Sequence, residues 1–390
     1  MGIMKNEKSP LGLYMHIPFC VKKCAYCDFL SMEASEGTKR QYVEALLAEL
    51  ESVRRIANSY DLQTIYLGGG TPSVLDTTLM WGILEKTQDV FSVNLPGMKE
   101  ITLEVNPGTV SKEKWKEYQK MGIRRISMGL QSTHNDELKL LGRIHNYEQF
   151  LENYHGAREA GFDNISIDLM SALPNQTLDK YRMSLERVAK LSPEHISSYS
   201  LIVEEGTPFW SLYGENGRKK KELPTEETDR EMYEATKEVL SSYGYHRYEI
   251  SNYAKAGYES IHNSSYWTGV PYLGVGLGAS SYLENNRYQN RDDMKGYLKY
   301  ASDTDKRRIL VESLTKEEQM SEFMFLGLRR MYGVSKTDFY NIFGTAMEQV
   351  FGEALDKMER EMLLEIEGDR VSLTDRGIDV SNFVFSEFLL

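Results

Sequence analysis

Strand-like and helix-like segments alternate along roughly the first half of the chain, and this alternation limits the possible folds more than any other sequence feature. Each short apolar run is followed by apolar residues at helical spacing. Repeated β-α units imply a parallel sheet covered by helices. A full (β/α)8 barrel takes ~250 residues, so about six units here predict an α/β fold with a partial (β/α)6 TIM-like barrel. The expected strands are Leu11–Ile17, Thr64–Leu67, Glu100–Val105, Arg125–Gln131, Asn164–Met170 and His195–Val203.

The pattern changes toward the C-terminus, where helical stretches lead into two short apolar runs. Gly368-Asp369 separates these runs and is a looser version of the Asp-Gly turns that mark β-hairpins. Helices followed by a hairpin predict a C-terminal α+β domain of winged-helix type. We therefore expect two domains, residues 1–290 and 291–390. The helices are expected at Lys316–Met331, Ser335–Phe343 and Met347–Glu361, and the hairpin strands at Leu363–Glu367 and Arg370–Leu373.

Composition excludes several classes of protein. The chain is 41% hydrophobic and 27% charged, as in ordinary globular proteins. No apolar run reaches the ~20 residues of a membrane helix, and Met1–Pro10 lacks the apolar centre of a signal peptide. We therefore expect a soluble, cytoplasmic protein. The formal net charge of -12 disfavours binding to nucleic acid. Residues 316–390 carry 8 Lys and Arg against 15 Asp and Glu, so the winged-helix-like region is expected to pack on the barrel and not to bind DNA.

All three cysteines of the chain, Cys20, Cys24 and Cys27, follow the first expected strand directly. An odd, clustered set of thiols forms no disulfide framework and indicates a reduced metal site. Thiolate ligands select zinc or an iron–sulfur cluster. Structural zinc takes four protein ligands, so zinc would need a further ligand such as His16. Three thiolates without a fourth cysteine favour an iron–sulfur cluster with one iron left open.

The spacing of these cysteines, with Tyr26 just before the last of them, resembles that of the radical SAM superfamily. The resemblance implies a [4Fe-4S] cluster whose open iron is chelated by the amino and carboxylate groups of S-adenosylmethionine (SAM). In that family, an electron from the cluster cleaves the sulfonium and releases a 5′-deoxyadenosyl radical. Gly68–Pro72 lacks the Gly-Lys-Ser/Thr of a phosphate-binding loop and looks like the glycine motif that meets the SAM amino group.

Further motifs occur in the order and spacing of the anaerobic coproporphyrinogen III oxidase branch, which the chain resembles over roughly residues 11–285. They lie around Tyr14, at Leu103–Pro107, at Ser127–Ser132, at Leu141–Arg143 and at Asp168–Met170. Carboxylates suit the ribose hydroxyls and the ammonium of SAM, and a planar guanidinium suits its carboxylate. The resemblance implies SAM binding by Tyr14, Tyr26, Gly69, Gly70, Thr71, Glu104, Gln131, Arg143 and Asp168.

Two departures from that branch matter. The oxidases carry a further cysteine in the pattern CxxxCxxCxC, whereas this chain has Phe29 at the last position. The oxidases also have a longer N-terminal segment that helps to enclose the substrate. Both departures count against oxidase activity.

The segment from His262 to Trp267 matches HNxxYW and resembles the signature of heme chaperones of the HemW type, which are relatives of the oxidase. A neutral imidazole can ligate heme iron, while Tyr266 and Trp267 offer flat apolar surface to a macrocycle. The resemblance therefore implies a heme site at His262, Tyr266 and Trp267. Candidates for a second axial ligand are His16, His134, His145, His155, His195 and His246.

These observations predict a heme chaperone, a radical-SAM-type [4Fe-4S] protein that binds heme and transfers it to acceptor proteins. One alternative is an oxygen-independent coproporphyrinogen III dehydrogenase, which oxidatively decarboxylates propionates through a 5′-deoxyadenosyl radical. Another is a radical SAM enzyme with a different substrate and a structural His262. The expected partners are heme, heme-acceptor proteins and an electron donor, with possible peripheral contact to membrane-bound acceptors.

A second glycine-rich segment, Gly274–Ala279, looks like a dinucleotide-binding fingerprint. It reads GxGxGA instead of GxGxxG and does not belong to the first β-α unit. We interpret it as a close-packed loop that approaches SAM or heme.

Overall fold

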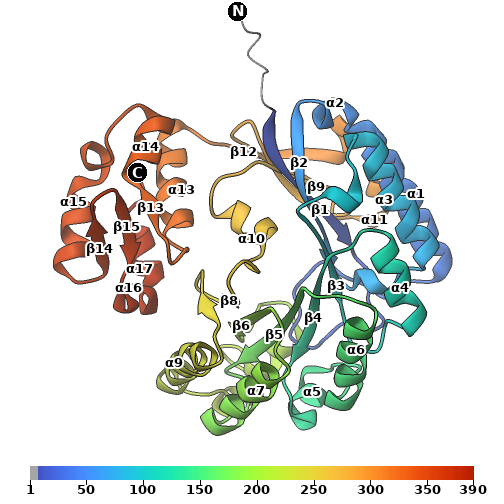
Figure 1. Ribbon diagram of the computed structural model, residues 1–390, viewed down its shortest axis with the longest axis horizontal. Helices are drawn as coiled ribbons and strands as arrows, with labels where there is room; N and C mark the ends of the chain where they lie inside the picture. The colour runs from blue at the N-terminus through green and yellow to red at the C-terminus, as the bar shows by residue number, and fades with distance from the viewer. Residues whose placement is uncertain (1–7) are drawn as a thin grey trace, which may run out of the picture.

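The larger domain is built on one open sheet, seen in a computed structural model that describes residues 8–390. The sheet has twelve strands in the order β12-β11-β10-β9-β1-β2-β3-β4-β5-β6-β8-β7, and its six central strands are parallel (Figure 1). The expected partial barrel is therefore confirmed. Its strands are β1 (Ser9–Ile17), β2 (Tyr60–Gly69), β3 (Glu100–Val105), β4 (Arg125–Gln131), β5 (Ile165–Ser171) and β6 (His195–Ser200).

Both edges of the barrel sheet are extended by strands from the middle of the chain. Beside β1 lies β9, which is parallel to it, followed by three antiparallel strands. Beside β6 lie two short antiparallel strands. These additions are β7 (His246–Arg247), β8 (Asn252–Ala254), β9 (Tyr272–Val275), β10 (Ser280–Leu283), β11 (Asn286–Asn290) and β12 (Arg308–Ser313).

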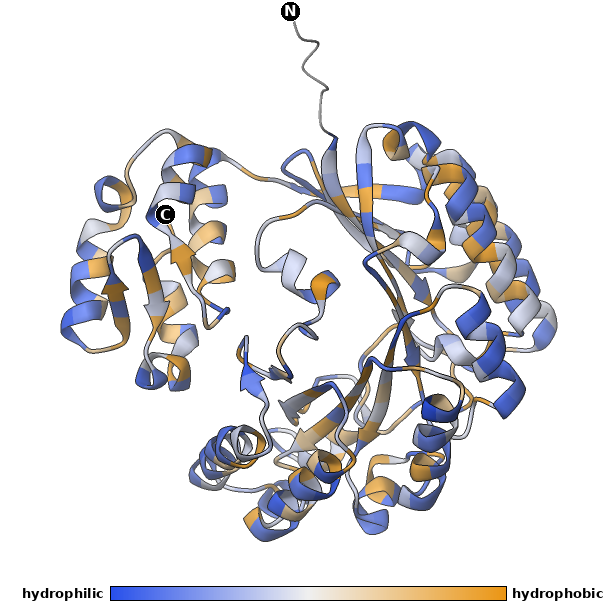
Figure 2. Ribbon diagram, viewed as in Figure 1, coloured by the Kyte–Doolittle hydropathy of each residue, from blue (hydrophilic) through white to orange (hydrophobic). Residues whose placement is uncertain are grey.

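Helices cover the convex face of the sheet and turn their apolar sides toward it (Figure 2). Polar side chains begin them: Ser111 accepts from the Lys114 N–H, and Asn146 forms a capping box with Gln149. The convex-face helices are α1 (Glu36–Ser52), α2 (Arg54–Ala57), α3 (Thr77–Phe91), α4 (Lys112–Lys120), α5 (Asn135–Leu141), α6 (Tyr147–Glu159), α7 (Leu178–Lys190), α9 (Glu226–Ser242), α11 (Met294–Tyr300) and α12 (Thr304–Arg307). A further helix, α8 (Pro208–Tyr213), packs against the loop after β1, where the Phe209 N–H donates to Ala25 O at 3.0 Å.

The concave face of the sheet is polar. Closed TIM barrels are filled by layers of branched apolar side chains. Here Tyr66 donates to Glu104 at 2.8 Å, and Ser127 donates to Asp168 at 3.3 Å. These bonds join neighbouring strands across the inside of the barrel, so the interior is a lined chamber and not an apolar core. The short helix α10 (Ile261–Tyr266) lies in the middle of the arc, between the barrel and the C-terminal domain (Figure 1).

The C-terminal domain has its own apolar core and confirms the expected α+β winged-helix-like architecture. The predicted hairpin turns at Gly368, which adopts φ +60°. The large sheet continues through β12, and the expected division between residues 290 and 291 stays a prediction. The elements are α13 (Lys316–Gly327), β13 (Val334–Ser335), α14 (Lys336–Phe343), α15 (Met347–Arg360), β14 (Leu364–Glu367), β15 (Arg370–Leu373), α16 (Asp375–Asp379) and α17 (Ser381–Ser386).

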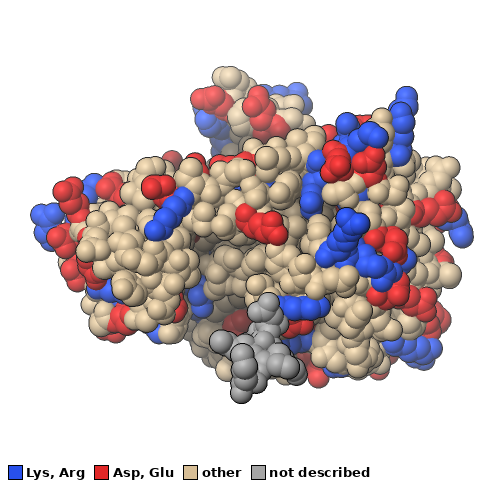
Figure 3. Space-filling model, turned by 90° about the horizontal axis from the view of Figure 1, so that it is seen from above, with Lys and Arg blue, Asp and Glu red and all other residues tan. Residues whose placement is uncertain are grey.

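Acidic and basic side chains are interspersed over the face of the molecule seen in Figure 3. In residues 8–390, no helix is long and apolar enough to cross a membrane.

Candidate functional site

The three cysteines lie on the loop between β1 and α1 and line one cavity at the C-terminal ends of the barrel strands. Backbone hydrogen bonds hold the loop there: the Cys20 N–H donates to Met32 O at 3.0 Å, and the Ala25 N–H donates to Leu141 O at 3.0 Å. Ligands of parallel α/β sheets collect at these strand ends, because the loops that follow the strands converge there.

Eight of the nine residues expected at the SAM site line the same cavity as the cysteines. The exception is Tyr14, which does not line the cavity. Its hydroxyl lies 3.1 Å from Nδ1 of His16. Sequence positions far apart are thus brought together as the order of the strands predicts. The eight residues are Tyr26, Gly69, Gly70, Thr71, Glu104, Gln131, Arg143 and Asp168.

Two glycines at the end of β2, Gly69 and Gly70, are required because other residues approach their backbone closely. Gly69 has φ +114°, and a Cβ on it would lie 2.6 Å from the ring of His16. A Cβ on Gly70 would lie 2.8 Å from the backbone oxygen of Phe19. Since Phe19 immediately precedes the first cysteine, these glycines allow the loop after β2 to pack directly against the cysteine loop.

Two carboxyl groups face this cavity with altered acidity. Burial raises the pKa of Glu104 to about 7, and the nearby Asp168 carboxyl adds to the rise. Hydrogen bonds from the Tyr66 hydroxyl and from the Gly69 N–H, at 2.8 and 3.1 Å, act in the opposite direction. Burial also raises the pKa of Asp168. Both carboxyls would be stabilised by a cationic ligand such as a sulfonium or an ammonium.

Arg143 connects the cavity wall to the cysteine loop. Its Nη2 donates to Asn106 Oδ1 at 2.5 Å and to Gly129 O at 2.6 Å, and its Nη1 lies 3.5 Å from Cys24 Sγ. Asn106 also donates to Thr71 at 2.6 Å. Asn106 belongs to the Leu103–Pro107 motif but was not predicted to have a role; its side chain joins the guanidinium of Arg143 to Thr71 in the loop after β2. Nε of Arg143 is buried with no hydrogen-bond partner in residues 8–390.

The end of β4 is irregular where it meets the cavity. The pairing with β5 shifts register between Gly129 and Gln131, and Gln131 has φ +74°. Such bulges re-aim a side chain at the end of a strand, and positive φ is uncommon for a residue other than glycine. The bulge turns Gln131 into the cavity wall.

The donor set fits a cluster better than it fits zinc. In the part of the chain that the structure describes, no three His, Cys, Asp or Glu side chains are close enough to hold one metal ion. His16, the candidate fourth zinc ligand, has Nδ1 3.1 Å from Tyr14 and Nε2 2.8 Å from Leu30 O. A cluster has its irons at separate corners and therefore takes thiolates that lie further apart. The three free thiols around one glycine-walled cavity suit such a group.

The HNxxYW segment forms α10, which carries His262 on its buried side. Nδ1 of His262 lies 2.8 Å from the Thr64 hydroxyl, and Nε2 lies 2.9 Å from the Tyr266 hydroxyl. The ring stacks on Tyr66, and burial lowers its pKa to about 3. The imidazole is therefore neutral and chemically able to ligate iron, but either nitrogen must first give up a hydrogen bond. The predicted ligation stays a prediction.

Two further groups near α10, Glu100 and Arg125, were not predicted from the sequence. Glu100, which is 3% exposed, accepts from the Ile261 N–H at 2.8 Å and from the His262 N–H at 3.1 Å, and so fixes the start of the helix. Arg125 is 2% exposed, and its Nε and Nη1 have no hydrogen-bond partner in residues 8–390. Its charge helps to lower the pKa of His262. A buried acid or base at the start of a strand gives no pattern that distinguishes it from a solvated one.

The remaining predicted heme residues differ in their surroundings. Tyr266 packs edge-on against Tyr272, with ring centroids 4.8 Å apart. Trp267 is covered by the guanidinium of Arg329 from the C-terminal domain, 4.5 Å from the ring. The apolar surface expected for a macrocycle is therefore shared with a contact between the two domains.

The other histidines, candidates for a second axial ligand, are spread over the molecule. His195 is buried, with Nδ1 2.8 Å from Ser166 and Nε2 2.8 Å from the Tyr248 hydroxyl. His246 is paired with Glu259 at 2.7 Å. No choice among the candidates follows from these positions.

The dinucleotide-like segment is a close-packed turn after β9. The Gly276 N–H donates to the buried Glu49 at 2.8 Å, and a Cβ there would lie 2.6 Å from His16 O and from the Tyr42 hydroxyl. A Cβ on Gly278 would meet Leu30 at 2.5 Å. The glycines therefore allow the segment to pack closely against Leu30 and His16, as expected of a close-packed loop. The expected approach to SAM or heme stays a prediction.

Comparison with known proteins agrees with this geometry. The family model of the radical SAM superfamily matches residues 14–188, and that of the HemN C-terminal domain matches residues 314–380. The solved structure of coproporphyrinogen III oxidase (HemN) from Escherichia coli superposes with a TM-score of 0.84, at 22% identity, over 98% of this chain and 90% of that one. The fold and the cysteine loop together define a radical SAM protein.

Closer relatives narrow the family. Heme chaperone HemW from Lactococcus lactis subsp. lactis is 38% identical over 98% of both chains. Heme chaperone HemW from Bacillus subtilis is 37% identical over 96% of this chain and 98% of its own. The chain belongs to the HemW family of radical SAM proteins, and membership of the superfamily implies a [4Fe-4S] cluster and SAM.

Proposed function

We propose that this protein is a heme chaperone, which binds heme and transfers it to acceptor proteins. The proposal rests on sequence identity of 37–38%, over nearly the whole chain, to proteins named heme chaperone HemW. The HNxxYW motif on α10 agrees with it. A neutral, buried imidazole on that helix supports the proposal, because heme iron takes neutral imidazole as a ligand.

The cysteine loop would hold the cluster, and the cavity around it would hold SAM. Cys20, Cys24 and Cys27 supply the thiolates, and burial raises the pKa of the Cys27 thiol, so its deprotonation depends on metal binding. When bound, the cluster can donate an electron to the sulfonium of SAM. Arg143 is the donor available to the SAM carboxylate, and Glu104 is the acceptor available to its ammonium.

Heme would contact His262, Tyr266 and Trp267, in agreement with the motif on α10. Its acceptors are proteins that require heme. We further propose an electron donor that reduces the cluster, peripheral contact with membrane-bound acceptors, a cytoplasmic location and no nucleic-acid partner. The acidic net charge of -12 supports the last point.

Phe29 is the observation that separates this proposal from coproporphyrinogen III dehydrogenase. The oxidases carry a cysteine at this position, whereas Phe29 is 64% exposed at the rim of the cysteine cavity.

The test uses the full chain with its cluster reconstituted without oxygen. One sample receives heme, and a second receives coproporphyrinogen III, SAM and a reductant. We expect stoichiometric heme binding, transfer of that heme to an apo-hemoprotein, and no decarboxylated product. Turnover of the porphyrinogen without heme binding would contradict the chaperone proposal and support a coproporphyrinogen III dehydrogenase.

A further inference from the structure

Tyr66 on β2 connects α10 to the wall of the cysteine cavity without lining the cavity itself. Its hydroxyl donates to Oε1 of Glu104 at 2.8 Å, and Glu104 lies in the cavity wall. Its ring stacks on the ring of His262, with centroids 5.1 Å apart and an angle of 28° between the ring planes. The side chain of Tyr66 therefore spans the space between His262 and Glu104.

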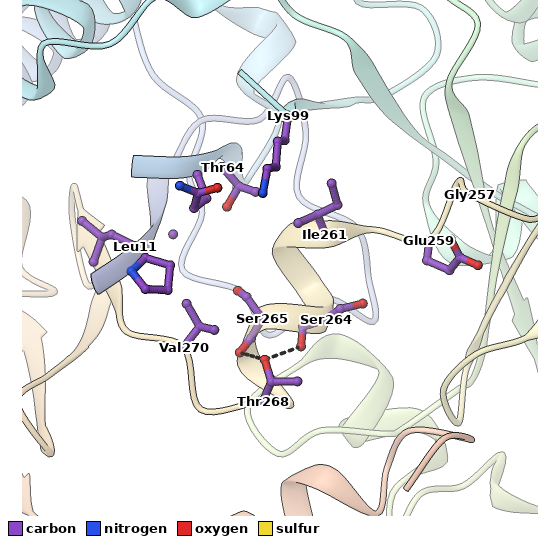
Figure 4. Close-up of a pocket in the computed structure, with 13 residues that line it drawn as sticks. Leu11, Thr64, Lys99, Gly257, Glu259, Ile261, Ser264, Ser265, Thr268 and Val270 are labelled. Atoms are coloured by element: carbon purple, nitrogen blue, oxygen red, sulfur yellow. Dashed lines mark hydrogen bonds between the residues drawn. The ribbon is translucent and has the colours of Figure 1, made fainter. Parts of the chain in front are cut away.

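The ring of His262 is itself held in place by β2. The Thr64 hydroxyl lies 2.8 Å from Nδ1 of His262, and Thr64 shares a face of the strand with Tyr66, two residues further on. A separate cavity of about 560 Å³ on the other side of α10 is lined by Thr64, Ile261 and Ser265 (Figure 4). The helix thus presents Ile261 and Ser265 to that cavity and His262 to Tyr66.

Gly68 leaves room for the bond between Tyr66 and Glu104. A Cβ on Gly68 would lie 2.8 Å from Cε1 of Tyr66 and 3.1 Å from Oε1 of Glu104. Any side chain at this position would push the tyrosine and the carboxyl group apart. The first glycine of the Gly68–Pro72 motif is therefore explained by this contact, while Gly69 and Gly70 serve the approach to His16 and Phe19.

Both oxygens of Glu104 are oriented by donors from β2. Oε1 accepts from Tyr66, and Oε2 accepts from the Gly69 N–H at 3.1 Å. Within residues 8–390, Tyr66 is the only side chain that donates a hydrogen bond to Glu104. A carboxylate oxygen can accept a second hydrogen bond, so each oxygen can still accept from a ligand in the cavity.

The Tyr66 hydroxyl also stabilises the ionised form of Glu104. Burial raises the pKa of this carboxyl to about 7, and the bond from Tyr66 is the largest of the effects that lower it. Burial raises the pKa of Tyr66 well above its usual value, so the hydroxyl keeps its proton and remains a donor. Other titratable or charged groups face Glu104 from neighbouring elements or share its cavity: Asp168 on β5, Arg125 on β4, Tyr14 on β1, Tyr266 on α10, Arg143 after α5, and Lys22, Cys20, Cys24 and Cys27 on the cysteine loop.

We propose that Tyr66 is a positioning residue of the SAM site, whose hydroxyl orients Glu104 and stabilises its carboxylate for the ammonium of SAM. The inference rests on the proposed role of Glu104 as the acceptor for that ammonium. Tyr66 acts through Glu104, since it does not line the cavity. Its ring contact with His262 makes α10, which lies outside the cysteine cavity, a support of the SAM site.

Tyr66→Phe removes the hydroxyl and keeps the ring that stacks on His262. Without the donor, the pKa of Glu104 should rise by about one unit. At pH 7, SAM affinity of the cluster-loaded variant should then be about five-fold below that of the parent, and the difference should shrink to less than about two-fold near pH 8.5. Titration of the SAM ammonium affects both proteins equally and cancels in this ratio. Calorimetry of SAM binding at several pH values measures it.

The pH dependence of this ratio distinguishes positioning from a purely structural role. If Tyr66 only stabilises the fold, the variant loses affinity by the same factor at every pH. A constant ratio, in a parent whose own affinity rises between about pH 6 and 8, overturns the inference and leaves the role of Glu104 intact. A parent whose affinity does not rise rejects Glu104 as the acceptor, and the role of Tyr66 with it.

Two further variants show whether Tyr66 acts through Glu104. In the Glu104→Gln background, Tyr66→Phe should change SAM affinity by less than about two-fold at every pH, because no carboxylate remains to be stabilised. An effect of the same size in both backgrounds overturns the inference. Tyr245→Phe is the matched control: it removes a tyrosine hydroxyl that donates to Pro193 O at 2.6 Å, away from the cysteine cavity, and should keep the pH profile of the parent.

A measurement without SAM tests the same contact directly. Carbon-13 NMR of ligand-free protein labelled at the glutamate carboxyls follows the titration of Glu104, whose resonance is the one lost in Glu104→Gln. Tyr66→Phe should move the midpoint upward by about one pH unit. An unchanged midpoint in a variant that circular dichroism shows to be folded overturns the inference.

Discussion

Glu104 is a partly buried acid in the wall of the cysteine cavity, and its ionisation should make ligand binding there depend on pH. Its position at the end of β3 could be predicted from the strand order, since the preceding residues form a short buried strand. Its raised pKa could not, because the rise depends on burial and on Asp168, which is far away in sequence. The same holds for Arg143, whose partners Asn106 and Gly129 come from different strand ends.

A cationic ligand should bind more tightly as Glu104 ionises. Its pKa is about 7, so SAM affinity of the cluster-loaded protein should rise between about pH 6 and 8, with a proton released on binding. Linkage gives the opposite sign for the ligand-free fold: a raised carboxyl pKa means that stability falls as pH rises from about 4.5 to 7. Calorimetry of SAM binding from about pH 6 to 8 measures the expected rise in affinity.

Glu104→Gln should remove that pH dependence, and Glu33→Gln, at an exposed acid near the cysteine loop, should retain it. A parent whose SAM affinity stays constant from pH 6 to 8 would show that Glu104 does not contact the ammonium.

Arg143→Lys tests the fork-shaped contact. A lysine cannot bind Asn106, Gly129 and a ligand carboxylate together, because it lacks the planar array of donors. Hydrogen bonds to charged groups contribute ~1.5–3 kcal/mol, so SAM affinity should fall roughly ten- to a hundred-fold. Equilibrium dialysis on cluster-loaded protein measures the affinity, and Arg124→Lys, at an exposed position just before β4, is the control. Unchanged affinity would remove Arg143 from the SAM site.

At the scale of elements, α10 depends on a clamp from another part of the chain. A six-residue helix is too short to be stable alone. Glu100 at the start of β3 accepts from its first N–H groups, and Thr64 on β2 fixes His262. The HNxxYW pattern predicted a functional role for this segment. Neither the helix nor its contacts with Glu100 and Thr64 could be predicted, since both depend on tertiary structure.

Glu100→Gln should loosen α10 without disturbing the cysteine loop. A neutral amide forms weaker bonds to the helix N-terminus than a carboxylate does, so the free energy of unfolding should drop by ~1–2 kcal/mol. Cleavage by a protease within residues 255–270 should become faster, as mass spectrometry of the fragments can show. Glu44→Gln, at an exposed position on α1, should leave both unchanged. Equal cleavage of the Glu100 variant and the parent would mean that other contacts hold the helix.

At the scale of the whole molecule, the barrel and the C-terminal domain each have an apolar core of their own. The alternation of strands and helices predicted the barrel, and the turn at Gly368 predicted the C-terminal hairpin. The extension of the sheet by β9 to β12 was not predicted, because these strands are short and do not follow the β-α rhythm. The contacts between the domains also left no sequence pattern: Arg329 covers Trp267, and Asp375 pairs with Lys237 and Arg247 at 2.6 and 3.1 Å.

The C-terminal domain should therefore unfold separately from the barrel. Exposed ion pairs contribute ~0–1 kcal/mol each, and Asp375 is 72% exposed, so its two ion pairs couple the domains only weakly. Calorimetry should resolve two transitions. The double variant Arg329→Ala and Asp375→Asn should lower the temperature of the C-terminal transition by a few degrees and leave the barrel transition in place. A single cooperative transition whose temperature falls in the double variant would show instead that the two domains unfold as one unit.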